Sequence, residues 1–300
     1  MKIALTGATG FVGRALTQKL LANGHDVTAL VRSPERAARA LPPQVARMAW
    51  NEAGESDAME GAGALIHLAG ESVAGGRWTR ARRRRIHESR GPALARLLES
   101  AGELPGVIIS ASAVGIYGDR GDEELTENSP AGGGFLAEVC QDWEAALQSR
   151  PAAETRRVAL RIGMVLGRGG GAMARLLPVF RMGLGGRLGQ GRQWMSWIHL
   201  EDLTELILFA LETPGLSGAV NAVSPQPVSN REFTEAMAKA VGRPAFFHAP
   251  AFALRLALGQ MSGIMLDSQR VLPAAALEQG FTHRYTSLEM ALEEVCAARR

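Results

Sequence analysis

Cysteine is almost absent from this 300-residue chain, which contains only Cys140 and Cys296. The two lie far apart and form no Cys-x-x-Cys pair, so the sequence excludes a disulfide framework and a zinc site built from thiolates. We predict no metal site. Low cysteine usage is typical of proteins of the reducing cytoplasm, and we expect a cytoplasmic protein.

Long apolar runs are also missing. No stretch reaches the roughly 18 residues that a membrane-spanning helix needs. The first ten residues, MKIALTGATG, lack the apolar stretch and small-residue cleavage site of a signal peptide. With 46% hydrophobic and 21% charged residues, the composition excludes disorder, collagen and coiled coil. We therefore expect a soluble globular protein without a membrane partner.

Lysine is rare as well, since Lys2, Lys19 and Lys239 are the only three and arginine supplies the rest of the 33 basic residues. Seven arginines lie between residues 77 and 90. Such a cluster occurs in nucleic-acid-binding proteins, but here the net charge is only +3 and few aromatic side chains are present for base stacking. We interpret the cluster as the solvated face of a helix and expect no nucleic-acid partner.

Short apolar strands alternate with helical patterns through the first half of the chain. Strands are predicted over residues 2–6, 27–31, 47–50, 64–68, 107–112 and 158–162. Helices are predicted over residues 11–22, about 80–101 and 137–149. Strands that are apolar throughout indicate a parallel sheet covered on both faces. The predicted fold class is therefore α/β, a Rossmann-like doubly wound parallel sheet.

Glycines become frequent after Gly163, and the pattern of the chain changes there. Further helices are predicted over residues 172–182, 201–212, 229–241 and 287–298, and a strand over residues 219–223. We expect two domains. Residues 1–168 form the sheet domain, residues 169–300 mainly form a smaller cap domain, and the 200–224 segment returns to the sheet.

The most informative motif follows the first predicted strand. It reads Thr6-Gly7-Ala8-Thr9-Gly10-Phe11-Val12-Gly13, with glycines in the spacing GxxGxxG. Glycines between a strand and a helix let the backbone turn tightly and approach a pyrophosphate, which binds at the helix N-terminus. The alternative is a purely structural turn. We predict a dinucleotide site whose residues are Gly7, Thr9, Gly10, Phe11, Val12 and Gly13.

The end of the second strand predicts which dinucleotide binds. A carboxylate at this place would hold the ribose 2′-hydroxyl of NAD. This chain instead has Arg32 followed by Ser33, and Asp26 lies at the wrong end of the strand. Because a cation suits a 2′-phosphate, we predict that NADP(H) is favoured over NAD(H). The alternative is that Arg32 is an exposed surface arginine.

These motifs together resemble a known superfamily. The loop TGATGFVG, the strand end His67-Leu68-Ala69-Gly70, and Ser110-Ala111-Ser112 followed by Tyr117-Gly118 are similar to the extended short-chain dehydrogenases/reductases. More narrowly, the chain resembles the NAD-dependent epimerase/dehydratase family and its atypical epimerase-like members. The segments that carry this closer resemblance are LAGESV at 68–73, GRW at 76–78, FLAEVCQDWE at 135–144, LRIGMVLG at 160–167 and WMSWIHLEDL at 194–203.

The resemblance covers nearly the whole chain. It implies a Rossmann-like domain, a small C-terminal substrate domain and bound NADP(H). It also implies a homodimer through the helices predicted over residues 80–101 and 137–149. We add Leu68, Ala69, Gly70 and Arg161 to the predicted cofactor-binding residues.

The catalytic pair of the superfamily is missing. Its members use a Ser or Thr, which Ser112 matches, together with Tyr-x-x-x-Lys, in which the lysine lowers the pKa of the tyrosine. This chain has no lysine between Lys19 and Lys239, and its only tyrosines are Tyr117 and Tyr285. A Tyr-x-x-x-Lys pair is therefore excluded, so the mechanism of the superfamily does not carry over.

Other residues are candidates for the proton donor. Tyr117 is the first, because it follows the strand of Ser112 at the edge where open α/β sheets bind ligands. Glu71 and His199 come next; the alternative for each of the three is a structural role. We interpret Cys140 as a buried thiol and Asp202 as a helix-start carboxylate rather than as catalytic groups.

Aromatic residues are few, so a group of them points to a substrate pocket or to packing between domains. We predict that the substrate contacts Arg77, Trp78, Trp194, Ser196 and Trp197. The predicted function is that of an NADP(H)-binding epimerase or reductase acting on an unknown small polar substrate with a non-standard proton donor. The alternative is a non-catalytic NADP(H)-binding regulator or redox sensor.

Overall fold

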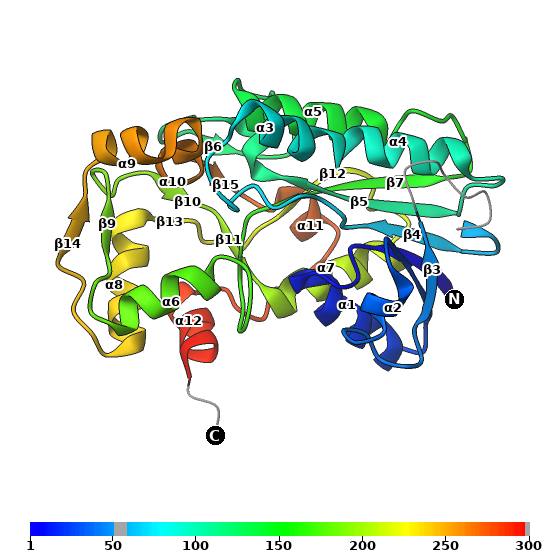
Figure 1. The fold of residues 1–300 in the computed structure, drawn as a ribbon, viewed down its shortest axis with the longest axis horizontal. Helices are drawn as coiled ribbons and strands as arrows, with labels where there is room; N and C mark the ends of the chain where they lie inside the picture. Colours follow the sequence, from blue (N-terminus) through cyan, green and yellow to red (C-terminus); the bar gives the residue numbers. More distant parts are fainter. Residues whose placement is uncertain (51–58, 298–300) are drawn as a thin grey trace.

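A seven-stranded parallel sheet forms the centre of the molecule (Figure 1). The computed structural model describes residues 1–50 and 59–297. The strands, in their order across the sheet, are β12 (Gly218–Ala222), β7 (Arg156–Ile162), β5 (Val107–Ala113), β4 (Ala64–His67), β1 (Lys2–Thr6), β2 (Asp26–Val31) and β3 (Ala46–Ala49). The predicted Rossmann-like doubly wound sheet is confirmed, and so is the return of the chain at β12.

The strand order reverses between β1 and β4. From β1 the chain adds β2 and β3 on one side, and then crosses back to add β4, β5, β7 and β12 on the other. Ligands of open α/β sheets bind in the crevice at the carboxyl ends of the strands beside such a reversal. The loops after β1, β2, β4 and β5 all open toward that crevice, and they carry most of the predicted site residues.

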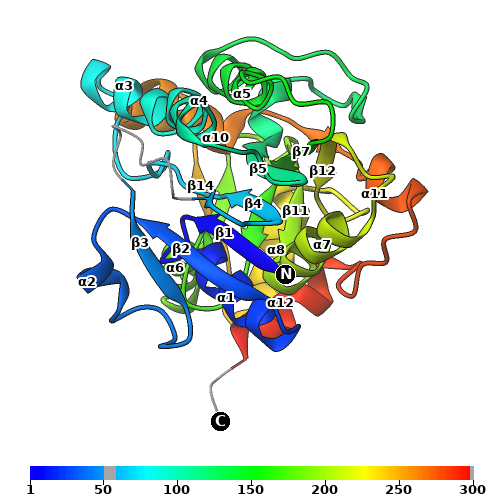
Figure 2. The same cartoon turned by 90° about the vertical axis from the view of Figure 1, so that its right-hand side faces the viewer.

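Helices cover both faces of the sheet (Figure 2). One face packs against α1 (Phe11–Ala22) and α7 (Leu200–Glu212), which contact each other, and α2 (Pro34–Ala37) follows β2. The other face packs against α4 (Gly91–Ser100) and α5 (Phe135–Ala146), with α3 (Arg80–Glu88) beside α4. Both interfaces are apolar cores, because the strands carry hydrophobic side chains toward each helix layer.

The single helix predicted over residues 80–101 is wrong, because the chain forms α3 and α4 with a break at Arg90. Arg90 has φ −122° and ψ −99°, outside the helical region. Pro92 in the first turn of α4 has no N–H to continue α3 and suits a helix start. At Gly91 a Cβ atom would lie 2.8 Å from the carbonyl oxygen of Asp142, so the break also brings α4 close to α5.

The second half of the chain builds a smaller body with its own apolar core. This core gathers Trp197, Phe233, Met237 and residues of the last helix. Its helices are α6 (Met173–Arg181), α8 (Asn230–Val241), α9 (Ala251–Leu258), α10 (Gly263–Leu266) and α12 (Leu288–Cys296). The short helix α11 (Ala274–Glu278) instead packs against β12 of the central sheet. The division at residue 168 and the homodimer remain predictions.

Short strand pairs connect the segments of this second half. The pairs are β8 (Met164–Leu166) with β11 (Trp197–His199), β9 (Gly186–Leu188) with β14 (Phe247–Ala249), β10 (Trp194–Met195) with β13 (Val228–Ser229), and β6 (Glu124–Leu125) with β15 (Arg270–Val271). The last pair links the loop after β5 to the C-terminal part. Within the described residues, no helix combines the length and the apolar character needed to cross a membrane.

Candidate functional site

The three glycines of the motif after β1 differ in how much space surrounds them. Gly7 has φ +71°, and a Cβ there would lie 2.7 Å from the carbonyl carbon of Leu68. A Cβ on Gly13 would come within 2.1 Å of the carbonyl oxygen of Gly7. Gly10 is exposed, and its Cβ would meet only the Gly7 oxygen, at 3.1 Å. Gly7 and Gly13 are therefore required by the turn itself, whereas Gly10 leaves open space on its outer side.

The N-terminus of α1 is free to receive an anion. Gly10 is its N-cap and supplies no side-chain cap, so the first-turn N–H groups have no such partner. Thr9 and Gly10 are exposed beside these groups. Phe11 and Val12 are half-buried and form part of the helix, so their backbone N–H groups are the atoms that face an anion. This cradle fits the pyrophosphate of a dinucleotide.

The ring of Phe11 also explains a glycine run further along the chain. A Cβ on Gly170 would lie 2.2 Å from Phe11 Cδ2, and one on Gly171 would lie 2.9 Å from Phe11 Cε1. The loop after β8 therefore passes directly over the start of α1. Side chains larger than hydrogen would push this loop away from the predicted nucleotide site.

A second feature of the site is a cavity of about 390 Å³ between the glycine loop and the end of β2. Its lining residues are Thr9, Val31, Arg32, Ser33 and Arg36. Arg32 and Arg36 are exposed, and neither guanidinium has an ion-pair partner within residues 1–50 and 59–297. A cavity with two unpaired arginines and two hydroxyls matches the chemistry of a phosphate monoester.

Arg36 was not predicted as a site residue. The Ser33 side chain caps α2 by accepting a hydrogen bond from Arg36 N at 3.4 Å, which places Arg36 one turn along the helix. The sequence feature that could have identified Arg36 is Ser33-Pro34. This pair begins a helix, and a helix places residue 36 on the same side as residue 33. Glu35 is the nearby carboxylate; its own backbone and a hydrogen bond from Ser33 hold its pKa below the usual value.

Residues 68–70 follow β4 and form the wall of the loop opposite Gly7. Thr6 Oγ1 accepts a hydrogen bond from Ala69 N at 3.2 Å and lies 3.0 Å from His67 Nδ1. Burial, together with the positive charge of Arg90, lowers the pKa of His67 to about 4, so this imidazole is neutral near pH 7. A neutral His67 beneath this loop is compatible with a dinucleotide bound above it.

Ser112 is held at the end of β5 by a carboxylate that the sequence did not single out. Its Oγ donates a hydrogen bond to Glu144 Oε1 at 2.7 Å. Arg161 lies opposite Ser112 in the sheet register and donates to both Glu144 oxygens, from Nε to Oε1 and from Nη2 to Oε2, each at 2.9 Å. Because its proton is used by Glu144, Ser112 can only accept a hydrogen bond from a bound ligand in this arrangement.

Arg161 was predicted as a cofactor-binding residue, and the structure shows its guanidinium bound to other residues of the protein. Its guanidinium is buried between Glu144 and Tyr117. Burial by itself lowers the pKa of Arg161, but the hydrogen bonds and charge of Glu144 more than offset this and raise the pKa above its usual value. Arg161 therefore serves as an internal counter-ion, and its site is closed to a phosphate by Glu144.

Tyr117 is fully buried, contrary to the prediction that its phenol reaches a substrate. The hydroxyl lies 2.7 Å from Asn221 Oδ1 and 3.0 Å from the Thr126 carbonyl oxygen, and it accepts a hydrogen bond from Arg161 Nη1 at 2.9 Å. Burial raises its pKa further from neutrality. The loop after β5 packs Tyr117 under the C-terminal part of the chain, where it joins β5, β7 and β12.

His199 also takes a structural position. It is buried, its Nδ1 accepts a hydrogen bond from Glu201 N at 3.2 Å, and its Nε2 lies 3.2 Å from Glu294 Oε2. Its ring stacks on Tyr285 with 3.8 Å between centroids. Both ring nitrogens are thus used in capping α7 and fixing α12. Asp202 accepts the backbone N–H groups of residues 284 and 285, so it too is structural.

Glu71 remains accessible. Its side chain is 38% exposed and its carboxylate lies 3.5 Å from Arg82 of α3. The backbone of Glu71 is fixed by Ser89, whose Oγ accepts its N–H, and by Arg90, which donates to its carbonyl. Cys140 of α5 is buried as expected, and burial raises the pKa of its thiol to about 11, so it is neutral near pH 7.

The predicted substrate residues separate into two groups. Trp197 is fully buried and donates Nε1 to the Gln226 carbonyl, while Ser196 Oγ donates to the Gln269 carbonyl. Packing and hydrogen bonds of the second half use both side chains. Trp194 is half-buried and donates Nε1 to Asp122 Oδ1 at 2.9 Å, which ties β10 to the loop before β6.

Trp78 and Arg77 lie at the rim of the crevice. Trp78 packs edge-on against Phe135, with 5.0 Å between ring centroids, and Arg83 lies 4.4 Å above the same Phe135 ring. Phe135 is the first residue of α5. This end of the site is therefore aromatic and cationic, and Arg77 is exposed beside it.

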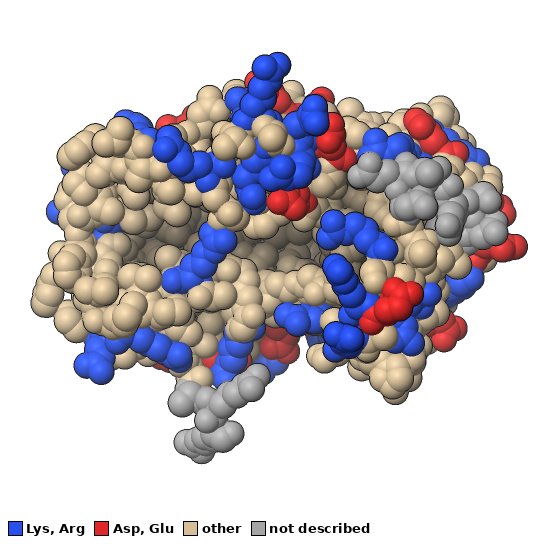
Figure 3. All heavy atoms as spheres, in the orientation of Figure 1, with Lys and Arg blue, Asp and Glu red and all other residues tan. Residues whose placement is uncertain are grey.

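A groove crosses the face that contains these residues. Figure 3 shows it as a hollow with Lys and Arg side chains on both rims. Arg175 of α6 donates a hydrogen bond to the Ala74 carbonyl in the loop after β4, so the two halves of the molecule also touch directly here. A positive rim favours an anionic ligand.

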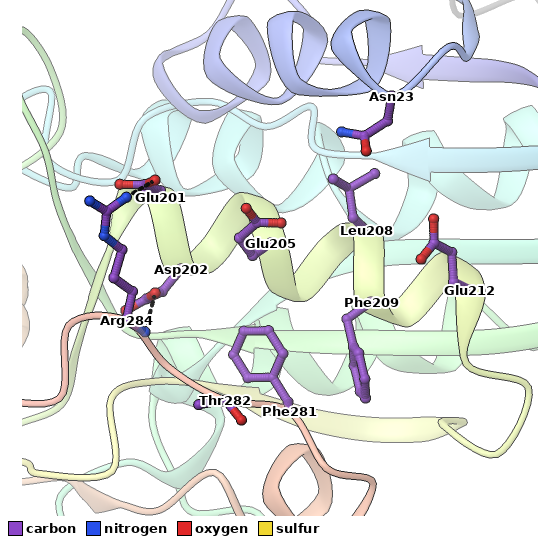
Figure 4. Close-up of a pocket in the computed structure, with 10 residues that line it drawn as sticks. All are labelled: Asn23, Glu201, Asp202, Glu205, Leu208, Phe209, Glu212, Phe281, Thr282 and Arg284. Carbon is purple, nitrogen blue, oxygen red and sulfur yellow. Dashed lines mark hydrogen bonds and ion pairs between the residues drawn. The ribbon is translucent and has the colours of Figure 1, made fainter.

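A second cavity, of about 430 Å³, lies between α1, α7 and the segment after α11 (Figure 4). Its lining includes Glu201, Glu205 and Glu212, and Asn23 marks the C-terminal end of α1. Lys19 forms an ion pair with Glu205 but does not itself line the cavity. The carboxylates of this cavity would repel phosphates, and the cavity lies at the end of α1 opposite the glycine loop. It is therefore not the nucleotide site.

Comparison with known proteins places the chain in a family. The sequence profile described as "NAD dependent epimerase/dehydratase family" matches residues 3–222. The chain belongs to the NAD-dependent epimerase/dehydratase family. A second profile, a domain of unknown function (DUF1731), matches residues 249–295 of this family member.

Relatives of this protein come from several organisms, and they match most of its length. The "Epimerase family protein SDR39U1 homolog, chloroplastic" of Arabidopsis thaliana is 38% identical over 98% of this chain and 86% of the plant protein. The Bacillus subtilis "Epimerase family protein YfhF" is 37% identical over 100% of this chain and 99% of its own. The crystal structure of human epimerase family protein SDR39U1 (isoform 2) with NADPH has 34% identity and a TM-score of 0.87, over 99% of each chain. The resemblance seen in the sequence is therefore confirmed, and NAD(P) binding is supported.

Proposed function

We propose that this family member binds NADP(H) in preference to NAD(H) and uses it as an epimerase or reductase on a small polar substrate. The observation that carries the proposal is the cavity lined by Thr9, Arg32, Ser33 and Arg36, beside an uncapped helix N-terminus. Bound NADP(H) would supply hydride transfer. The NADPH in the human relative supports the same assignment.

The residues of this chain divide the work as follows. Backbone N–H groups of residues 11–13 hold the pyrophosphate, and Arg32 and Arg36 hold the 2′-phosphate. Ser112 accepts a hydrogen bond from a substrate hydroxyl, and its own proton stays on the Glu144 side. Glu71 is the accessible carboxylate for proton exchange. Tyr117 and His199 take no part, because other residues of the protein use the hydroxyl of Tyr117 and both ring nitrogens of His199.

NADPH is expected to bind about 10- to 100-fold more tightly than NADH, because one charge-assisted hydrogen bond contributes about 1.5–3 kcal/mol. Arg32→Ala and Arg36→Ala should each weaken NADPH binding and leave NADH binding nearly unchanged. Calorimetric titration with both nucleotides measures this. Arg39→Ala is the matched control, since Arg39 is exposed just beyond α2 and is absent from the cavity lining. Equal affinities for the two nucleotides in the unaltered protein would refute the preference.

A second candidate function, a non-catalytic NADP(H)-binding regulator, is favoured by one observation. The hydroxyl of Tyr117, the imidazole of His199 and the thiol of Cys140 are all buried. Regulators need only the nucleotide site, which is open.

A turnover screen separates the two candidates. Under the enzyme proposal, at least one compound in a panel of small carbonyl compounds that also carry a hydroxyl group is reduced with oxidation of NADPH. Ser112→Ala should lower that rate about two- to tenfold, as expected for one lost neutral hydrogen bond of about 0.5–1.5 kcal/mol. Tyr117→Phe should lower it no further than its loss of stability explains. Tight NADPH binding without turnover of any compound would support the regulator instead.

A further inference from the structure

One end of the molecule exposes an unusual number of large hydrophobic side chains. Nine of the twelve such residues in the described part of the chain lie in two segments, residues 179–184 and 246–265, which we call the apolar face. Phe246 is 89% exposed, Phe252 73% and Leu256 79%. These segments belong to α6, β14, α9 and α10, which lie together at one end in Figure 1.

The helix α9 shows that this exposure is systematic. None of its residues is buried, and its sequence AFALRLAL places Phe252 and Leu256 four positions apart on one side. Soluble surfaces rarely gather exposed apolar side chains in this way unless something covers them. Neither of the two cavities described above lies on this face.

Arginines predominate around the apolar face, and the carboxylates near it are Asp267, directly after α10, and the exposed Glu232 and Glu235 of α8. Residues 155–200 and 236–266 contain no Asp or Glu, while arginines occur throughout them, including Arg181, Arg187, Arg243 and Arg255. In Figure 3 this end is largely uncharged, with Lys and Arg at its margins and almost no acidic side chains. A surface of this kind is complementary to an apolar layer with negative headgroups.

The basic helix α3 continues this surface. Arg83 of α3 donates a hydrogen bond to Gln260 Oε1 at 3.1 Å, directly after α9, and Arg77 reaches within 3.7 Å of the Cβ position of Gly259. Arg80 and Arg85 are exposed on α3 and form no ion pair within the described residues. The arginine cluster noted in the sequence thus lies beside exposed Phe and Leu side chains.

We propose that the apolar face docks on an anionic lipid surface, with Phe246, Phe252 and Leu256 entering the headgroup boundary and the arginines contacting lipid phosphates. This function goes beyond nucleotide binding and does not depend on it, and it replaces the expectation from the sequence that the protein has no membrane partner. A second copy of the chain is disfavoured as the occupant, because arginines outnumber carboxylates at this face and two such faces would bring like charges together. A peptide is disfavoured because peptide anchors dock in pockets, and neither of the two cavities described above lies on this face.

The test is co-sedimentation of the full chain with vesicles. The unaltered protein is expected to bind vesicles that contain phosphatidylglycerol and not vesicles of phosphatidylcholine alone, and high salt should weaken the binding. The double variant Phe252→Ser/Leu256→Ser should lower the partition coefficient about tenfold or more, since two exposed apolar anchors are lost. Arg255→Glu should lower binding to the anionic vesicles in the same assay.

Met290→Ser is the matched control, because Met290 is an exposed residue of α12 outside the apolar face. It should bind vesicles as the unaltered protein does. NADPH affinity and melting temperature, measured for every variant, show that the fold is intact. Absence of vesicle binding by the unaltered protein, or full binding by the double variant, would overturn the proposal. Concentration-dependent dimerisation that Phe252→Ser/Leu256→Ser abolishes would instead identify a second copy as the occupant.

Discussion

Gly10→Val is expected to weaken NADPH binding by about 10²–10⁴-fold while the chain remains folded. A side chain at Gly10 meets only one backbone oxygen, at 3.1 Å, and otherwise enters the open space above the α1 N-terminus. That is the space the pyrophosphate needs. Losing two charge-assisted hydrogen bonds of about 1.5–3 kcal/mol each accounts for the expected size of the effect.

Gly13→Val provides the contrast to this variant. A Cβ on Gly13 would lie 2.1 Å from the Gly7 oxygen, so the loop and α1 cannot both keep their positions. We expect Gly13→Val to lower the melting temperature strongly, and Gly10→Val to leave it nearly unchanged. Titration with NADPH and thermal unfolding by circular dichroism measure both properties. Normal NADPH binding by Gly10→Val would place the nucleotide elsewhere.

Arg161→Met is expected to destabilise the protein by about 3 kcal/mol or more, which is the usual cost of leaving a buried charge without its partner. Arg161 donates two hydrogen bonds to Glu144 and one to the hydroxyl of Tyr117. The side chains of Arg161 and Glu144 are only 10% and 18% exposed, so water replaces little of the lost interaction. Urea unfolding with Arg161→Met and the unaltered protein measures the difference.

The double variant Arg161→Met/Glu144→Met tests the physical reason. If the cost of Arg161→Met arises from the unpaired Glu144 carboxylate, removing both charges should cost less than removing Arg161 alone. Arg157→Met, on the neighbouring position of β7, serves as a control, because Arg157 forms no ion pair within the described residues. A loss below about 1 kcal/mol for Arg161→Met would mean that the pair behaves as a surface ion pair.

The sequence by itself determined the sheet and most helices, and it predicted the place of the nucleotide site. These features depend on local patterns: apolar strands flanked by glycines, helical spacing in residues 11–22, and the GxxGxxG loop between a strand and a helix. The absence of a Tyr-x-x-x-Lys pair was also certain, because it follows from counting residues. Local patterns failed at residues 80–101, where Pro92 and close contact with α5 divide one predicted helix into two.

Only the tertiary structure decided which polar side chains face the crevice. Tyr117 follows the strand of Ser112 in sequence, yet contacts with Asn221 and Arg161, from distant segments, draw it into the interior. Glu144 belongs to the site because it accepts a hydrogen bond from Ser112, which lies 32 residues earlier in the sequence. Arg36 belongs to it because it lines the same cavity as Thr9. The direction of a side chain at a strand end depends on which long-range partners satisfy its hydrogen bonds. Because burial without a partner is costly, those partners rather than the local pattern fix its place.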